Sequence, residues 1–196
     1  MFKGQCSIIF VPLQIMRKIA LILMLALALP QNGIARNIRD LFTAMPESLM
    51  PILSENARKD LMDIYESGMR ASLQNEWNGR TTLLKMSDNH IQLQEDSEGV
   101  VKTDLLMLTG KKDTIVCMVR TLCIPEQDSE LLFYNTNWQQ LNTKQYLSDL
   151  PQGFTDDEMT LISVETTIGA SLTITRNGKD KTSYTWNGKK FVKDKE

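Results

Sequence analysis

The sequence predicts an α+β fold in which short N-terminal amphipathic helices precede an antiparallel β-meander of about eight to nine strands. Capping residues and apolar residues spaced three and four apart mark two helices between residues 37 and 68. Asn-Gly pairs at 78–79, 177–178 and 187–188 are typical of hairpin turns. Between the turns, apolar and polar residues alternate with the period of two that a half-buried strand requires.

The start of the chain has the order of a signal peptide. Met16-Arg17-Lys18 is positively charged, residues 19–29 are an unbroken apolar run, and Gly33-Ile34-Ala35 is a small-x-small cleavage site. The apolar run is shorter than the roughly 20 residues that cross a bilayer, which disfavours the alternative of a membrane anchor. Residues 1–35 are therefore interpreted as an over-long start followed by a cleaved signal peptide.

Met16 is then the expected true start, and Arg36 begins a mature chain that forms a single α+β domain over residues 36–196. We expect the protein to be exported, to the periplasm or to the cell surface or medium. Removal of the leader changes the formal net charge from -2 to -5. A mildly acidic surface argues against nucleic-acid binding, which needs a basic footprint.

Two helices are expected before the sheet. Asn37 caps the first, which ends at Pro46, and Ser54 caps the second, which ends at Gly68. Their apolar stripes are Ile38, Leu41, Phe42 and Met45 in the first helix, and Ala57, Leu61, Ile64 and Tyr65 in the second.

The turns predict the strand register. A two-residue loop at 78–79 would pair Leu73 with Leu84 and Ala71 with Met86. A loop at Asp88-Asn89 would pair Met86 with Ile91 and Leu84 with Leu93, so that apolar residues share one face.

The C-terminal turns are treated in the same way. A two-residue loop at Asn187-Gly188 would place Tyr184 opposite Phe191. At Asn177-Gly178 an odd loop is expected instead, with Gly178 left-handed in a bulge. Only an odd loop brings Leu172 and Ile174 to the face of Tyr184 and Trp186.

Further strands are expected over residues 100–108, 114–124, 130–136 and 160–168. The strand over 114–124 is apolar on both faces apart from Arg120, so we expect it to be central. A short helix should follow Asn142 or Thr143 and end before Pro151, and Thr155 to Glu158 has the form of a capping box.

Cys117 and Cys123 would both remain after cleavage of the leader. Six residues of one extended strand separate them by roughly 20 Å, whereas a disulfide needs α-carbons within about 7 Å. They are therefore expected to be two core thiols on one face and not a disulfide.

Few catalytic devices are available, and no catalytic, cofactor-binding or metal-binding residue is assigned. His90 is the one histidine, which rules out sites with several histidine ligands, and its place beside the turn at Asp88-Asn89 suggests a polar turn residue. There is no phosphate loop, Gly-x-Gly-x-x-Gly, Cys-x-x-Cys or Gly-x-Ser-x-Gly. The acidic clusters, Asp156 to Glu158 and Asp96 with Glu98, are more typical of caps and turns than of a catalytic pair.

Aromatic residues are the candidates for a ligand or partner surface. They are Trp77, Trp138, Trp186 and Tyr184. The tryptophans could line a carbohydrate or lipid cleft. Trp77 and Trp186 adjoin hairpin turns, where a tryptophan more often packs on its cross-strand neighbour.

Several short segments together resemble a known family. They are Arg39-Asp40-Leu41-Phe42, Met45-Pro46, Ser48-Leu49, Leu61 to Met69, Cys117 to Cys123, Phe133-Tyr134, Trp138, and Tyr184-x-Trp186-x-Gly188-x-x-Phe191. With the leader, they resemble an uncharacterised domain-of-unknown-function family of exported proteins from gut Gram-negative anaerobes. The resemblance implies export and implies no activity, because that family carries no established catalytic or binding residues.

Three functional hypotheses follow. The first is a non-enzymatic module of the cell envelope or the secreted fraction that binds an unknown protein or small ligand, with no cofactor. The second is a carrier of a small apolar ligand or lipid, held in a cavity of the β-meander. The third is an unrecognised hydrolase, which would need two close carboxylates in a cleft, or His90 near a Ser or Cys.

Overall fold

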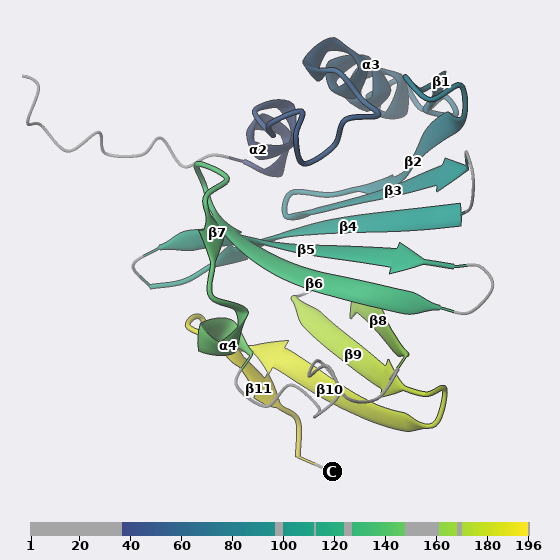
Figure 1. Cartoon of the computed structure of the whole chain (residues 1–196). Coiled ribbons are helices and arrows are strands. Elements are labelled where there is room, and N and C mark those ends of the chain that lie inside the picture. Colours follow the sequence, from purple (N-terminus) through teal and green to yellow (C-terminus); the bar gives the residue numbers. More distant parts are fainter. Residues whose placement is uncertain are drawn as a thin grey trace, which may run out of the picture. The chain divides into compact units, whose positions relative to one another are not determined.

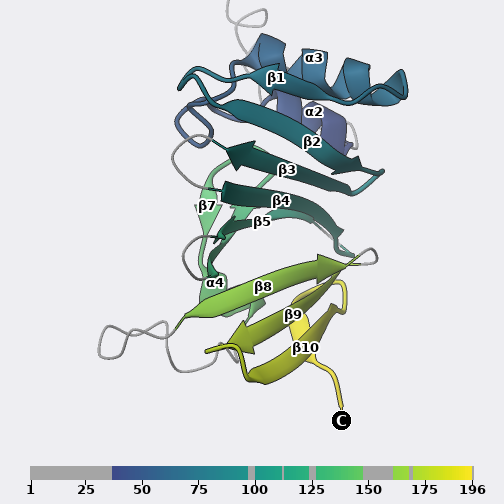
Figure 2. The ribbon, with the colours of Figure 1, turned by 90° about the vertical axis from the view of Figure 1, so that its right-hand side faces the viewer.

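A layer of helices and two antiparallel sheets are stacked in the unit formed by residues 36–196 (Figure 1, Figure 2). The computed structural model describes residues 37–96, 100–111, 113–123, 127–147, 161–167 and 170–195. The expected signal peptide, Glu98 and the capping box at Thr155 to Glu158 lie outside these residues.

The three described helices begin where capping residues predict. They are α2 (Ile38–Thr43), α3 (Glu55–Glu66) and α4 (Thr143–Tyr146). Side chains of Asn37, Ser54 and Asn142 each accept a hydrogen bond from a backbone N–H of the first turn. Gly68, at φ +76°, ends α3 in the left-handed conformation that glycine adopts most easily. No helix in the described part of the chain is long and apolar enough to cross a membrane.

The first sheet has seven strands in sequence order: β1 (Ser72–Gln74), β2 (Arg80–Met86), β3 (His90–Asp96), β4 (Val100–Thr109), β5 (Thr114–Leu122), β6 (Asp128–Asn135) and β7 (Gln140–Leu141). The second sheet has four, in the order β11 (Phe191–Lys193), β10 (Asp180–Trp186), β9 (Ser171–Arg176) and β8 (Ile162–Thr167). Every pairing in both sheets is antiparallel.

The protein is thus mainly β with short helices, and the expected antiparallel meander of about eight to nine strands roughly fits the described strands, although they form two sheets. Eleven strands are described, and the hydrogen-bonded order breaks between β7 and β8. The second meander then packs on the first instead of extending it. Alternation within a strand reveals that one face is buried, but it does not reveal which element covers that face.

Two cores lie on the two faces of the first sheet. On one face, helices α2 and α3 cover residues such as Ile91, Leu93 and Met118. On the other face, strands β8 to β11 cover residues such as Cys117 and Phe133. β5 lies between the two cores and is buried on both faces from Ile115 to Val119, as expected of the central strand.

Arg58 fastens the loop between α2 and α3 from within the first core. Its side chain is 1% exposed and is buried beside the expected apolar stripe of α3. The guanidinium donates to the backbone oxygens of Leu53 (2.7 Å), Met45 (2.6 Å) and Thr43 (3.1 Å). Five N–H donors in a rigid fork allow one arginine to satisfy several carbonyls of an irregular loop.

The turn between β1 and β2 differs from the expected two-residue loop. Leu73 pairs with Thr81, and Asn75 donates its backbone N–H to Gly79, so the loop has three residues. The side-chain oxygen of Asn75 accepts from the N–H groups of Trp77 and Gly79, and Asn78 takes the left-handed φ of 61°. This side-chain turn outweighs the Asn-Gly preference, and the expected pairings of Leu73 and Ala71 are therefore wrong.

The next hairpin keeps the expected pairing of Met86 with Ile91, but the pairing of Leu84 with Leu93 is wrong. The register shifts between Leu83 and Lys85, so that Leu83 lies opposite Leu93. This bulge leaves Leu84 42% exposed and keeps Leu83 in the core.

Of the C-terminal turns, the odd loop with a left-handed Gly178 is confirmed: Leu172 lies opposite Tyr184, and Gly178 has φ +66°. The last turn is displaced from its expected position, because Asn187 pairs with Lys190. As a result Trp186 lies opposite Phe191, and the expected pairing of Tyr184 with Phe191 is wrong. The side-chain oxygen of Asn187 accepts from the N–H groups of Lys189 and Lys190 at 2.9 Å, which stabilises this arrangement.

Candidate functional site

A polar cluster is buried between the two sheets. Nε2 of His90, on β3, lies 2.7 Å from Oδ1 of Asp104, on β4. The same carboxylate oxygen accepts from the hydroxyl of Thr166 on β8 at 2.7 Å and from the amide of Gln92 at 2.9 Å. His90 is 1% exposed and Asp104 is 5% exposed. One buried oxygen on β4 thus gathers three donors, two from β3 and one from β8.

The cluster does not have the geometry of a nucleophilic triad. In such a triad the acid holds one ring nitrogen of the histidine and the nucleophile meets the other. Here Asp104 and the Thr166 hydroxyl, at 3.4 Å, both lie at Nε2 of His90. Nδ1 is buried and has no partner among the described residues. His90 therefore cannot act as a base toward the Thr166 hydroxyl with Asp104 at its other nitrogen, as a triad requires. Because the ring is buried, a substrate also has no access to it.

The cluster instead belongs to a series of contacts that fasten β8 to the first sheet. The backbone N–H of Ile162 donates to Asp128, and that of Val164 donates to the Ser129 hydroxyl at 3.0 Å. Thr166 then reaches Asp104 farther along the strand. An edge strand exposes unpaired N–H groups, and these side chains occupy them. The polar residues between the sheets therefore have a structural role.

His90 was expected to be a polar turn residue, and that interpretation is wrong. It is the first residue of β3 and occupies the face opposite to Ile91 and Leu93. The alternation of β3 does place it on that face. Burial follows only because the second sheet covers the face, which the sequence does not reveal.

Among the described residues, the two most buried carboxylates cannot work as a pair. Glu95 lies on the helix side of the first sheet, in line with Leu93, whereas Asp104 faces the second sheet. Burial raises the pKa of the Glu95 carboxyl, and the nearby charge of Arg120 partly opposes this effect. Within the described ranges, no three His, Cys, Asp or Glu side chains gather as metal ligands.

Cys117 and Cys123 are free thiols. Cys117 is fully buried in the second core, and burial raises the pKa of its thiol. Since the thiolate is the reactive form, this position suits packing and not nucleophilic chemistry. Cys123 lies just beyond the end of β5 and is half-buried.

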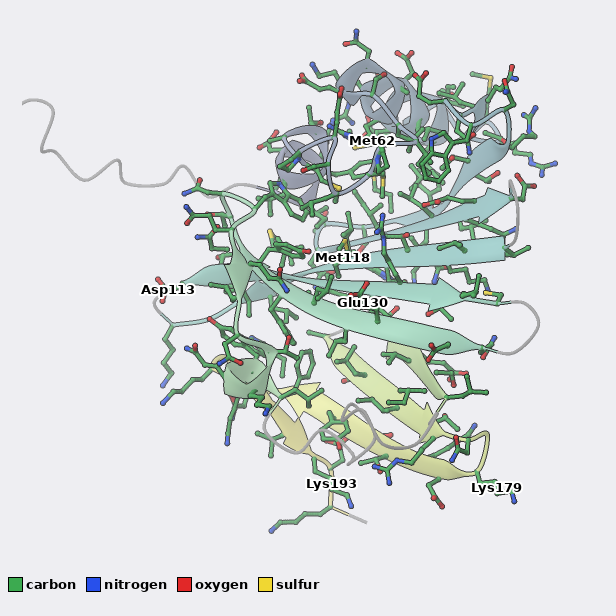
Figure 3. The ribbon with its side chains drawn as sticks, in the orientation of Figure 1. Met62, Asp113, Met118, Glu130, Lys179 and Lys193 are labelled. Atoms are coloured by element: carbon green, nitrogen blue, oxygen red, sulfur yellow. The ribbon has the colours of Figure 1, made fainter. Side chains whose placement is uncertain are left out.

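An open pocket of about 500 Å³ lies where two turns and one helix meet. It is lined by the β4–β5 turn, by α4 and by the β10–β11 turn, and Asp113 marks its position in Figure 3. The side chains around it are Lys111, Asp113, Ile115, Gln145, Tyr146, Trp186, Asn187 and Lys189. Volumes of roughly 300–1,000 Å³ are usual for small-ligand sites.

Aromatic rings form the apolar part of this pocket. Tyr146 and Trp186 have ring centroids 6.3 Å apart and planes inclined by 34°. Behind them, Phe133 packs 5.1 Å from Tyr146, and Phe191 packs edge-on to Trp186 at 5.4 Å. The indole N–H of Trp186 donates to the backbone oxygen of Thr109 at 3.0 Å. These contacts hold the two pocket rings in fixed orientations.

The two turns of the pocket touch through their backbones. A Cβ atom at Gly110 would lie 2.7 Å from the carbonyl oxygen of Gly188 and 2.9 Å from that of Asp113. Only glycine permits this approach without displacement of one turn. With the bond from Trp186 to Thr109, the contact joins the β4–β5 and β10–β11 hairpins on one side of the pocket.

The four aromatic residues singled out in the sequence do not gather in one place. Trp77 is 60% exposed in the β1–β2 loop. Trp138 is 7% exposed in the first core, where its indole N–H donates to Leu41, and Tyr184 is 2% exposed in the second core. Trp186 lines the pocket. The packing of Trp186 on Phe191 also agrees with the alternative of a cross-strand contact.

Tyr146 is the pocket residue that sequence reasoning missed. It is the last residue of α4, a helix of one turn, and nothing in its local pattern separates it from a packing residue. Its partner Trp186 follows 40 residues later in the chain. Their contact forms only when the second sheet packs beside α4, so it depends on the tertiary structure.

Comparisons with known proteins bear on the fold and the family. A family model described as "Protein of unknown function (DUF3256)" matches residues 31–175. The chain belongs to this family. In this DUF3256 protein the matched segment ends within β9, so the β10–β11 turn of the pocket lies beyond it. The comparison with curated proteins gives no match.

The DUF3256 chain is also similar to a solved structure described as a domain of an uncharacterized protein from Porphyromonas gingivalis W83. The TM-score is 0.62 and the identity is 24%, over 80% of this chain and 98% of the other. This likeness supports the fold and is silent on function.

Proposed function

We propose that this DUF3256 protein is an exported, non-enzymatic binding module of the cell envelope or the secreted fraction, and that its ligand site is the pocket beside Tyr146 and Trp186. The proposal includes an origin in a gut Gram-negative anaerobe, on the segments that carry the family resemblance. The observation that supports it most is the pocket itself, where two held aromatic rings meet exposed polar side chains. Apolar walls with a few polar groups are typical of small-ligand sites.

The leader supports the exported location. Its positive, apolar and small-x-small segments follow one another in the order of a signal peptide. Export also accounts for the processing that we propose after Ala35. The protein would then meet its ligand outside the cytoplasm.

The other two hypotheses receive less support. A lipid carrier needs an apolar cavity, whereas side chains such as Leu106, Phe133 and Leu172 fill the space between the sheets. A hydrolase needs an accessible acid, base or nucleophile, whereas His90 and Asp104 are buried in a structural contact.

Native mass spectrometry of the protein purified from its own envelope extract tests the proposal. A single chain that begins at Arg36 is the expected species, and a labile additional mass of roughly a few hundred daltons would be a ligand of the pocket. A chain that retains residues 1–35 and fractionates with the cytoplasm would refute export. Turnover of a cell-wall, glycan or peptide substrate that one carboxylate or Ser substitution abolishes would refute a non-enzymatic role.

A further inference from the structure

We infer that the pocket beside Tyr146 and Trp186 binds a saccharide that carries a carboxylate group. This inference rests on the proposed function, because it names the chemical class of ligand for the same pocket. It follows from the aromatic pair, from the mixture of donors and acceptors around it, and from the excess of lysine over aspartate.

The aromatic pair suits the face of a sugar ring. Tyr146 and Trp186 line the pocket side by side, at a centroid distance of 6.3 Å. Pyranose rings present C–H groups on one face, and these pack against the electron-rich face of an aromatic ring. Because Phe133, Phe191 and the Thr109 carbonyl already hold the two rings, little side-chain freedom is lost when a ligand binds.

The polar groups around the rings suit hydroxyls better than they suit an alkyl chain. Gln145 is an exposed amide able to donate and to accept, the exposed amide nitrogen of Asn187 can donate, and Asp113 is an acceptor. The side-chain oxygen of Asn187 is already engaged by the turn. Sugar hydroxyls also donate and accept, so such a rim can satisfy several of them at once. An acyl chain offers these groups no hydrogen-bond partner of its own, and the pocket is open where an acyl chain needs enclosure.

The charges select for an acid. Lys111 and Lys189 are exposed residues of the two turns, and Asp113 is the one acidic residue among the described residues of the lining. Two ammonium groups beside one carboxylate leave a local excess of positive charge on a chain whose formal net charge is -2. An acidic sugar would therefore be attracted to this end of the molecule and bind more tightly than its neutral counterpart.

Titration of the isotope-labelled protein with tri-galacturonic acid, monitored by NMR, tests the inference, with the methyl ester of the same trisaccharide as the neutral control. The acid should shift the indole N–H signal of Trp186 and the backbone amides of the two turns. It should bind more tightly than the ester, and the preference should decrease as salt is added.

Three variants give the expected pattern. Lys111→Ala and Lys189→Ala should each weaken binding of the acid about two- to fivefold and leave the ester unaffected, as for exposed charge pairs. Trp186→Ala should weaken both ligands. Because Trp186 also packs in the core, the lysine variants keep the test valid if that variant does not fold. Lys179→Ala is the matched control, since Lys179 is an exposed lysine far from Asp113 (Figure 3).

Equal binding of acid and ester, or shifts that map elsewhere, would overturn the inference. A fragment library screened on the same spectra separates this failure from failure of the proposed function. If neither trisaccharide binds but other fragments shift the Trp186 signal, the saccharide inference is wrong and the binding pocket stands. If no compound shifts the pocket signals, both proposals are overturned.

Discussion

Replacement of Asp104 by alanine should destabilise the protein strongly, because one oxygen of this side chain accepts from three donors. In Asp104→Ala the buried ring nitrogen of His90 and the hydroxyl of Thr166 both lose their acceptor. Each polar group left unsatisfied in a buried position costs about 1–3 kcal/mol. Gln92 and Thr166 are both half-buried, and the longer Gln92 side chain can turn toward water. The free energy of unfolding should therefore decrease by about 3–5 kcal/mol, as when one partner of a buried pair is removed.

The bond between the sheets can be isolated with a second substitution. Thr166→Val keeps the shape of the side chain and removes one of three donors, which should cost about 1–2 kcal/mol. In the double variant, the Thr166 hydroxyl is already absent when Asp104 is removed, so it is not left without a partner. The decrease in the free energy of unfolding of the double variant should therefore be about 1–2 kcal/mol smaller than the sum of the decreases in the two single variants.

Urea denaturation of the purified chain, followed by far-UV circular dichroism and tryptophan fluorescence, measures these values. The matched control is Thr173→Val, on β9, whose hydroxyl lies 3.3 Å from Ser183 in an exposed setting. It should change stability by less than about 0.5 kcal/mol. If the coupling between Asp104 and Thr166 is below about 0.5 kcal/mol, the two residues act independently and the assigned contact between the sheets is refuted.

Three further predictions concern two buried groups and the contact between the two turns. Glu95→Gln should stabilise the protein at pH 7, because burial raises the pKa of the Glu95 carboxyl above its ordinary value of 4.5 and the charged form destabilises the fold. The increase in the free energy of unfolding, measured by urea denaturation across pH, should disappear as the pH falls below 4.5, and an increase that does not depend on pH would contradict this cause. Iodoacetamide should label Cys123 but not Cys117 in the folded protein, and both residues in urea, since Cys117 is fully buried and the pKa of its thiol is raised. Mass spectrometry of the labelled peptides measures the extent of labelling, and labelling of Cys117 at the rate of Cys123 would contradict the burial of Cys117 in the second core. Gly110→Ala should destabilise the protein by about 1–3 kcal/mol, because the new Cβ atom clashes with the Gly188 carbonyl. It should also weaken ligand binding, although it replaces none of the side chains that line the pocket. Unchanged thermal stability would show that the two turns do not touch.

Local chemistry determined the start of each described helix and the strand content. Asn37, Ser54 and Asn142 cap helices as expected, because a capping side chain acts within three residues of itself. Gly68 and Gly178 take the positive φ that their positions require. The central place of β5 was also predictable, since a strand that is apolar on both faces must be covered on both.

The register of three hairpins was decided by contacts that a turn motif does not contain. The side chain of Asn75 lengthened the first loop, a bulge at Leu84 kept Leu83 opposite Leu93, and Asn187 displaced the last turn. The bulge keeps Leu83 on the buried face and leaves Leu84 42% exposed. In the first and last turns, side-chain hydrogen bonds of Asn75 and Asn187 outweigh the local Asn-Gly preference.

The packing of one sheet on the other was decided by the tertiary structure. Strand alternation shows that Cys117, Phe133 and Leu172 are buried, but it is compatible with a helix, a sheet or a closed barrel as the cover. In the folded protein the second meander packs on the first, buries His90 against Asp104 and brings Trp186 beside Tyr146. The sequence by itself determined the caps, the strands and the expectation of export. The buried polar cluster and the pocket exist only because residues distant in the chain meet, and the free energy of such contacts is not encoded in any local pattern.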